Sequence, residues 1–329
     1  MSLYQFNSHS ADYVQDLTYS GLVKVFGLKN VIDYKWNQKY HVPYKKYPKN
    51  LGYVSGSLLP SLAHLSVKQF DVVLVGSAKV DCFESYLAFM DRIPANVPVV
   101  FIDGGDQPVI GRDLIVYGRP ELYEEAIAKR PFDLVFKREM LIDQDYGKNV
   151  FPLPMCFNMD RARNVPKEKK YQVSFWAVES APIRVKALDL LSDQFDCKAN
   201  GTERNQKFSK YKRKGEFYLQ ELARCKIVLN FRGGGWDTMR YWEVPAIGSF
   251  MISQRPQFVI PQNFEHEKHV VFCQDDLSDL IELCEYYLEN ETAREQIATN
   301  GKNHLLQYHT DVKRAEYIIQ TIRSVCKNL

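Results

Sequence analysis

The residues best suited to chemistry lie together in the stretch NFRGGGWDTMRYWEVPAIGSFMIS, at positions 230–253. Three consecutive glycines follow an apolar run, and Arg240 and Glu243 stand three residues apart in a short segment of helical character. Glycine lets an anion approach the backbone, and the N–H groups at a helix start attract negative charge. Arg240 adds a cation, and the Glu243 carboxylate suits a pair of vicinal hydroxyls. The pattern predicts a site for a diphosphate attached to a ribose.

The same residues also fit a purely structural interpretation, in which the glycines form a flexible turn and Arg240 and Glu243 form a solvated ion pair. Two features favour the binding interpretation. The charged pair lies among aromatic and aliphatic residues, where a bare ion pair would be costly. Pro245 and Gly248 limit the helix to about two turns, so it would present an end rather than a packing face.

The elements that must position these residues alternate between strand-like and helix-like segments along most of the chain. The pattern predicts an α/β fold of two units with parallel sheets covered on both faces. We expect a helix at 21–27 before a first strand at 30–37, and a proline-rich junction at 151–170. Domain boundaries at 1–155 and 156–310 follow, with a last helix at 311–329. Further strands are expected at 71–76, 97–103, 132–136, 171–177, 195–200, 226–231, 249–253 and 268–273.

Composition excludes several classes of protein. The net charge is +3, from 43 basic and 40 acidic residues, which is too balanced for a bulk nucleic-acid binder. No apolar run is long enough to span a membrane, and the first residues lack the features of a signal peptide. The seven cysteines are scattered without a CxxC pair. We therefore expect reduced thiols and a cytoplasmic location.

The segment YLQELARCKIVLNFRGGGWDTMRYWEVPAIGSFMIS resembles the nucleotide-sugar-binding half of GT-B glycosyltransferases. RYWEVPAIGSFMIS is most similar to the CgeB-like and group 1-type families, and exostosin-like transferases resemble it more distantly. The resemblance extends over residues 171–314 and is weak before position 150. It implies a GT-B fold, two Rossmann-like αβα domains facing a central cleft. The N-terminal domain would bind an acceptor, the C-terminal domain a nucleotide sugar, and the last helix would cross back to the N-terminal domain.

The resemblance also implies roles for individual residues of the second half. Glu243 is the expected contact to ribose or sugar. The expected contacts to the diphosphate and its surroundings are Ser174, Arg232, Gly233, Gly234, Gly235 and Arg240. Retaining members often carry two glutamates separated by seven residues, but here positions 235 and 251 are Gly and Met. The stereochemical outcome is therefore open, as is whether Asp237 replaces the missing glutamate or caps the helix.

A glycosyltransferase that inverts the configuration at the anomeric carbon needs a group to deprotonate or orient the acceptor hydroxyl. Asp103 and Asp106, at the end of the strand 97–103, are the candidates, with Asp16 and His9 ranked below them. Asp103 alternatively caps the Gly-Gly turn that follows it. Lys137 and Arg138 follow the next strand, where they are either phosphate contacts or a solvated helix start. The basic run at 204–214 is either an electrostatic surface, for a diphosphate donor, an anionic acceptor or a peripheral membrane contact, or a solvated loop.

No metal and no cofactor are expected, with a UDP- or GDP-type sugar as co-substrate. The DQD at 143–145 has the form of a metal-binding DxD, but it precedes the junction and does not follow a strand. The expected partners are a nucleotide sugar and an acceptor that is a glycan, a protein or a small molecule, and no nucleic acid. Two alternatives remain open, an epimerase or hydrolase of the same fold and a non-catalytic subunit that binds nucleotide sugars. The donor sugar, the acceptor and the oligomeric state are also open.

Overall fold

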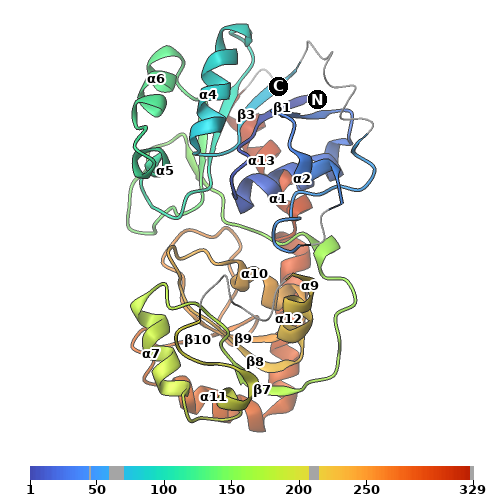
Figure 1. The fold of residues 1–329 in the computed structure, drawn as a ribbon, viewed down its shortest axis with the longest axis vertical. Helices are drawn as coiled ribbons and strands as arrows, with labels where there is room; N and C mark the ends of the chain where they lie inside the picture. The colour runs from blue at the N-terminus through green and yellow to red at the C-terminus, as the bar shows by residue number, and fades with distance from the viewer. Residues whose placement is uncertain (44–45, 59–69, 207–214, 327–329) are drawn as a thin grey trace. The chain divides into compact units, whose positions relative to one another are not determined.

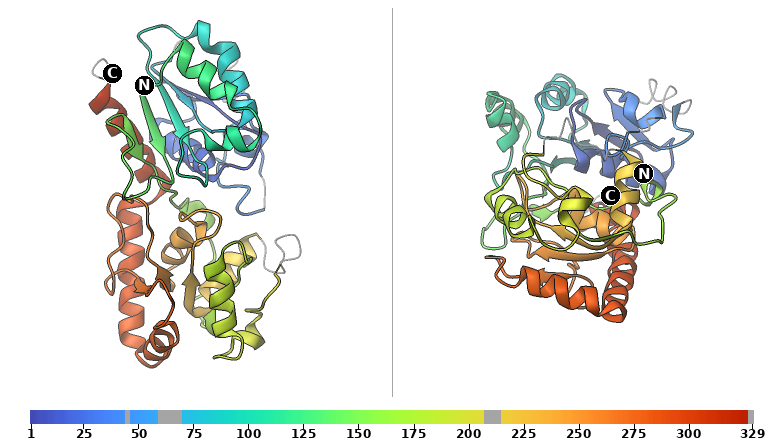
Figure 2. Two further views of the ribbon diagram at one scale, coloured as in Figure 1. Left: turned by 90° about the vertical axis from the view of Figure 1, so that its left-hand side faces the viewer. Right: turned by 60° about the horizontal axis from the view of Figure 1, so that its bottom comes forward.

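A computed structural model describes residues 1–43, 46–58, 70–206 and 215–326 of the chain, which forms two compact units. The first unit comprises Met1–Asn158, Phe258–Pro261 and Thr310–Leu329. The second comprises Met159–Gln257 and Gln262–His309. Each unit contains one parallel sheet with helices on its faces (Figures 1 and 2).

The sheet of the first unit has six parallel strands in the order β2-β1-β3-β4-β5-β6. Apolar, β-branched and aromatic residues dominate these strands, and nearly all of them are buried. This composition is typical of a parallel sheet covered on both faces. The strands are β1 (Leu3–Phe6), β2 (Val31–Tyr34), β3 (Val72–Val75), β4 (Val99–Asp103), β5 (Leu134–Lys137) and β6 (Val150–Pro152).

Helices cover both faces of this sheet. Helices α4 (Val80–Phe89) and α6 (Glu121–Lys129) share an apolar cluster with Phe6, Val75 and Phe101. The opposite face holds Phe136, whose ring lies 6.0 Å from that of Tyr317 on α13 (Asp311–Val325). Helix α1 (Tyr13–Phe26) packs along α13, which brings the C-terminal helix into the first unit. The described residues of this unit also form the short helices α2 (Gln38–His41), η2 (Met90–Arg92) and α5 (Arg112–Val116).

The sheet of the second unit has four parallel strands in the order β10-β9-β8-β7. They are β7 (Tyr171–Ser174), β8 (Cys225–Asn230), β9 (Phe250–Gln254) and β10 (Val271–Cys273). Alternate residues of these strands form one core with α7 (Pro182–Leu191) and α11 (Leu280–Glu289). Helices α9 (Glu216–Ala223), α10 (Met239–Ala246) and α12 (Glu291–Tyr308) also pack on the sheet, and η3 (Met159–Arg161) and α8 (Cys197–Asn200) are short.

The structure departs from the sequence expectations at three elements. Strand β1 lies before the predicted first strand, and it was missed because its four residues include Gln5. The stretch 195–200 contains the short helix α8 instead of the predicted strand. The Asp196 carboxylate accepts the β7 amides of Gln172 and Val173, so side chains occupy that edge of β7. Part of the proline-rich junction forms the edge strand β6, a position where proline is tolerated.

Candidate active site

The predicted site in the second unit lies where β8 ends and α10 begins. Asn230 is the last residue of β8, and its side chain is 4% exposed. Its Nδ2 donates to Ser253 Oγ over 3.0 Å, and its Oδ1 accepts from the Thr238 hydroxyl over 2.7 Å. Asn230 therefore joins two neighbouring strands to the start of the helix. The carboxyl ends of parallel strands are the edge where ligands bind in open α/β sheets.

Helix α10 is short and begins without a side-chain cap. Thr238 is its N-cap residue, but the Thr238 side chain forms no capping hydrogen bond. At the other end, Pro245 lies inside the last turn and Gly248 has a φ of +72°, a conformation that favours glycine. The helix thus presents an N-terminus with positive dipole character at the sheet edge.

The three glycines form a compact turn held from one side by Arg184. The Gly233 amide donates to the Gly235 carbonyl over 2.9 Å, and both residues are buried, whereas Gly234 is exposed. Arg184, in the first turn of α7, donates to the carbonyl oxygens of Phe231 and Arg232 over 3.0 and 2.9 Å. A Cβ at position 233 would lie 3.0 Å from Arg184 Nη2, so a side chain there would displace the guanidinium by a few tenths of an ångström.

Arg232 combines a partly exposed guanidinium with a fixed backbone. Its guanidinium lies over the Trp236 ring, 4.4 Å from the ring centroid, and its amide donates to Gln254 Oε1 over 3.4 Å. Stacking on an aromatic face holds a guanidinium without consuming its hydrogen-bond donors. Arg232 therefore has donors to offer to an anion at the turn.

Arg240 points toward the ends of β7 and β8. Its guanidinium donates to the Trp176 carbonyl, to the Tyr218 hydroxyl over 3.2 Å and to the Leu229 carbonyl over 3.4 Å. Glu243, one turn further along α10, is 3% exposed. The pair is thus enclosed within the second unit and is not a solvated surface pair.

The two remaining predicted residues of this unit are buried polar groups. Asp237 is 2% exposed, and its Oδ1 accepts the indole N–H of Trp242 over 2.7 Å. Because Thr238 is the N-cap, Asp237 does not cap the helix, which was one of its two expected roles. Ser174, at the end of β7, is 1% exposed, and its hydroxyl has no hydrogen-bond partner among the described residues. A buried hydroxyl of this kind is rare unless a ligand or water satisfies it.

In the first unit, Asp103 and Lys137 form a buried ion pair. Lys137 Nζ lies 3.2 Å from Asp103 Oδ2, and the two side chains are 0% and 1% exposed. The Asp103 carboxylate also accepts the amides of Gly105 over 3.1 Å and Gly111 over 2.8 Å. This geometry favours the turn-holding role that the sequence left open for Asp103. Lys137 is enclosed too, so it is not part of a solvated helix start, one of its two expected roles.

Asp106 and Arg138 form a second, more accessible pair. Arg138 Nη1 donates to Asp106 Oδ1 and to the Gly104 carbonyl, the latter over 3.0 Å. The Asp106 side chain is 56% exposed and that of Arg138 is 10% exposed. Of the two predicted acidic candidates, Asp106 is therefore the one that a solvent-borne substrate can reach.

The two lower-ranked candidates, Asp16 and His9, differ in their exposure. Asp16 is 2% exposed and accepts the Tyr40 hydroxyl over 2.9 Å, and burial raises its pKa to about 7. His9 is exposed, and its amide donates to Asp81 Oδ2 over 2.8 Å. Most of the basic run, positions 207–214, lies outside the described residues.

Within residues 1–43, 46–58, 70–206 and 215–326, no group of three or more His, Cys, Asp or Glu side chains is arranged to hold a metal ion. No helix in this part of the chain combines the length and apolar character needed to cross a bilayer.

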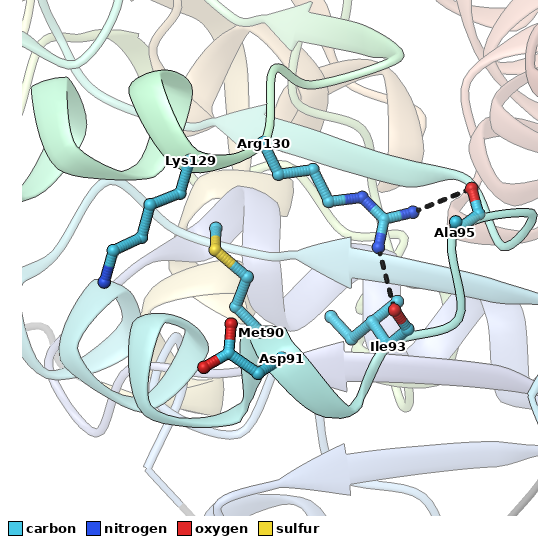
Figure 3. A pocket seen from close by; sticks show the side chains of 6 residues that line it. All are labelled: Met90, Asp91, Ile93, Ala95, Lys129 and Arg130. Carbon is cyan, nitrogen blue, oxygen red and sulfur yellow. Dashed lines mark hydrogen bonds between the residues drawn. The ribbon is translucent and has the colours of Figure 1, made fainter.

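A hollow of about 490 Å³ lies elsewhere in the first unit and contains none of the predicted residues. It is lined by Met90, Asp91, Ile93, Ala95, Lys129 and Arg130 (Figure 3). Arg130 donates to the carbonyls of Ile93 and Val97, over 3.1 Å for the first and 2.5 Å for the second. Its guanidinium therefore holds the loop that enters β4, a structural function at the amino ends of the strands.

Sequence reasoning missed Asn230, Arg184 and Tyr218 as parts of this corner. Asn230 carried a signal, because it is a polar residue ending an otherwise apolar strand. Arg184 and Tyr218 lie on helices distant in sequence from the glycines, and only the fold brings them to the turn. No local pattern identifies such residues.

Comparison with protein families connects this corner to a known class. The model of the family described as Glycosyl transferase-like matches residues 184–320, which include the glycine turn, α10 and α12. A search of curated protein sequences finds no match.

Solved structures share the fold along the whole chain. HepE from Anabaena, in complex with UDP and glucose, is 12% identical, with 98% of this chain and 99% of that chain covered and a TM-score of 0.60. Sucrose-phosphate synthase from Thermosynechococcus elongatus is 11% identical over 100% of both chains, with a TM-score of 0.59. An alpha-glucosyltransferase in complex with UDP and DNA is 10% identical over 100% of both chains, with a TM-score of 0.60. At such identities the likeness establishes the fold.

The chain has the GT-B fold, as the sequence predicted. The resemblance to group 1-type glycosyltransferases is also confirmed by the family match and the shared fold. The family match connects residues 184–320 with glycosyl transferase-like proteins, and the solved structures show that the fold of the chain is shared with glycosyltransferases.

Proposed function

We propose that this protein transfers a sugar from a UDP- or GDP-sugar to an acceptor hydroxyl, without a metal ion. The observation that carries the proposal is the corner between β8 and α10, where an uncapped helix start meets the glycine turn. Arg232 and Arg184 add two guanidinium groups beside that turn. Helix dipole, backbone amides and arginine together suit the charge of a leaving diphosphate. The neighbouring HepE structures contain UDP or UDP-glucose, which supports a donor of this chemistry.

Within this proposal, the second unit binds the donor and the first unit binds the acceptor. Glu243 accepts hydroxyls of the ribose or sugar, and its burial against an apolar helix gives those hydrogen bonds a low-dielectric setting. Ser174 supplies a further buried hydroxyl on the same sheet. Asp106 is the proposed group that orients the acceptor hydroxyl, because its carboxylate is exposed at the carboxyl end of β4. Asp103, Lys137 and Asp237 position the backbone around these groups.

The acceptor is a glycan, a protein or a small molecule, and nucleic acid is not among the proposed partners. All seven cysteines are free thiols, which fits a reducing compartment, and we place the protein in the cytoplasm. The basic stretch at 204–214 is the proposed place for any contact with a membrane surface.

The proposal is tested by a thermal-shift panel of UDP-, GDP-, CMP- and dTDP-sugars on the full chain. A ligand that binds the native state raises its melting temperature by mass action. We expect a UDP- or GDP-sugar to raise it, and Glu243→Ala to abolish the shift while the protein remains folded. A shift that is unchanged in Glu243→Ala would contradict the assignment of that residue.

Product analysis separates the transferase from the two other candidates. Release of sugar to water or conversion of the donor alone, with or without acceptor, would indicate a hydrolase or epimerase. Tight nucleotide binding without turnover of any donor would indicate a binding subunit. Turnover that persists in EDTA is expected from the metal-independent mechanism.

A further inference from the structure

Gln254 ends β9, and its side chain lies beside the backbone that leads into the glycine turn. Ser253 of β9 pairs with Asn230 of β8, so Gln254 is the next residue toward the carboxyl edge of the sheet. The Oε1 atom of Gln254 accepts the backbone amide of Arg232 over 3.4 Å, and Arg232 directly precedes the three glycines. The Gln254 side chain is therefore within hydrogen-bonding distance of this segment.

The bond to Arg232 determines the orientation of the Gln254 carboxamide. A backbone N–H needs an acceptor, so the side-chain atom that faces Arg232 is the oxygen, and the other terminal atom is the NH2 group. Gln254 is 9% exposed, and its NH2 group has no hydrogen-bond partner among the described residues. Such a deeply placed donor is rarely left unsatisfied unless water or a ligand binds it. Because the NH2 group shares its carbon with the bonded oxygen, that ligand would lie beside the turn.

The turn itself offers further donors. The Gly233 amide is bonded to the Gly235 carbonyl, but the amides of Gly234 and Gly235 have no partner in the part of the chain that the structure describes. The Arg232 guanidinium stacks on the Trp236 ring and forms no hydrogen bond to another described residue. All of these groups are donors, and one of them is a cation. They suit an anionic ligand with several oxygen atoms.

We propose that Gln254 is a phosphate-binding residue, whose NH2 group donates to the diphosphate of the donor while its oxygen holds the Arg232 amide. This inference rests on the proposed function and adds a residue of β9 to a phosphate site otherwise formed by the loop between β8 and α10. A carboxamide suits this position because it accepts from the backbone and donates to the ligand at the same time. A carboxylate would repel the phosphates, and an aliphatic side chain would form neither bond.

The test uses two substitutions that separate the two hydrogen bonds of Gln254. Gln254→Glu keeps an oxygen for the Arg232 amide but replaces the NH2 group with a second, negatively charged oxygen. Gln254→Leu removes both bonds at similar side-chain volume. Calorimetry on the full chain measures the binding of UDP and GDP, with uridine and guanosine as matched probes that lack the diphosphate. The melting temperature of each variant shows that it is folded.

We expect Gln254→Leu to bind the nucleoside diphosphate about tenfold more weakly, the typical effect of one hydrogen bond to a charged group. Gln254→Glu should bind it more weakly still, because its carboxylate faces the phosphates. The affinity for the nucleoside should be the same in all three proteins. Gln257→Leu is the matched control, since the Gln257 side chain already donates to the Arg255 carbonyl, and it should bind the diphosphate as wild type does.

Three results would overturn the inference while the proposed function stands: unchanged diphosphate binding in Gln254→Leu, wild-type binding in Gln254→Glu, or equal losses for nucleotide and nucleoside. The second result would show that Gln254 only holds the Arg232 backbone. If the wild type binds neither UDP nor GDP, the proposed function fails, and the inference fails with it.

Discussion

The Asp237 carboxylate accepts the indole N–H of Trp242 over 2.7 Å, and both side chains are buried. Trp242 is 0% exposed and packs against the rings of Tyr241, Phe264 and His309. The bond ties Asp237, two residues after the glycine turn, to the middle of α10. From this relationship we propose that Asp237 is a positioning group and does not replace the glutamate that the family pattern lacks at position 235.

The Asp237–Trp242 bond predicts different outcomes for two substitutions of the aspartate. Asp237→Asn retains an oxygen that accepts the indole N–H, so we expect donor affinity and kcat within about threefold of wild type. Asp237→Leu leaves that buried N–H without its acceptor and should lower the free energy of unfolding by about 1–3 kcal/mol. Urea denaturation and steady-state kinetics on the same preparations measure both effects.

A catalytic role for Asp237 would give the opposite pattern. A carboxylate that transfers a proton or stabilises charge contributes on the order of 100-fold or more to the rate. A loss of that size in Asp237→Asn with normal stability would refute the positioning role. Trp242→Phe is the matched control, because it removes the indole N–H but keeps an aromatic ring in the cluster.

The fold could be predicted because short runs of β-branched residues, which are typical of strands, alternate in the sequence with segments of helical character. The corner at the end of β8 was predictable for the same reason, since its glycines and the pair Arg240 and Glu243 are close in sequence. The hydrogen-bond partners of these residues could not be predicted from the sequence. Arg240 donates to Trp176, which follows β7, and to Tyr218 on α9, and only the fold brings these two residues to α10.

Burial decided the cases where the sequence allowed two interpretations. Asp103 and Asp106 are three residues apart and chemically alike, yet one is 1% exposed and the other 56%. The difference arises because Asp103 ends a central strand, where amides of the following turn surround it. Sequence spacing identifies acidic residues near a strand end, but it does not say which of them faces solvent.

The buried pair of Asp103 and Lys137 predicts a large effect on stability. Lys137→Ala leaves the Asp103 carboxylate enclosed without its cation, so the free energy of unfolding should fall by about 3–5 kcal/mol. Chemical denaturation measures the loss. Turnover per folded molecule should change far less, because neither side chain reaches solvent.

Replacing both members of this pair provides the control. Asp103→Asn/Lys137→Met removes both charges, and we expect it to recover part of the stability lost in Lys137→Ala. If Asp103→Asn alone were as stable as wild type yet inactive, Asp103 would be the acid–base group and its turn-holding role would be wrong. A pH–rate profile of Asp103→Asn distinguishes the two results.

The raised pKa of Asp16 predicts that the free energy of unfolding decreases as pH rises through the weakly acidic range. Burial raises its pKa from 3.8 to about 7, against the opposing effects of Lys39 and the Tyr40 hydroxyl. Between these values the unfolded chain has released the proton and the folded protein retains it, so the free energy of unfolding falls as pH rises. The loss is on the order of 4 kcal/mol and is complete above about pH 7.

Asp16→Asn should remove this dependence and keep an oxygen for the Tyr40 hydroxyl. We expect urea denaturation to show a flatter pH profile between pH 4 and 7 for the variant, and a variant more stable than wild type at pH 8. Asp143→Asn, at an exposed position, is the control and should leave the wild-type profile intact. Identical slopes in wild type and Asp16→Asn would show that another group controls the acid range.

The close approach of α1 and α13 at Gly21 predicts that a side chain at this position is not tolerated. A Cβ at Gly21 would overlap the carbonyl oxygen of Asp311 and lie 3.1 Å from the Ala315 Cβ. Backbone atoms cannot rotate away, so Gly21→Ala must shift a helix and should cost at least about 3 kcal/mol. Ser20→Ala, its neighbour, removes a hydroxyl that contacts Asp311 Oδ2 and the Leu17 carbonyl oxygen, and it should cost about 1 kcal/mol. Denaturation curves of the two variants compare these costs directly, and a Gly21→Ala protein as stable as Ser20→Ala would contradict the close approach of the two helices.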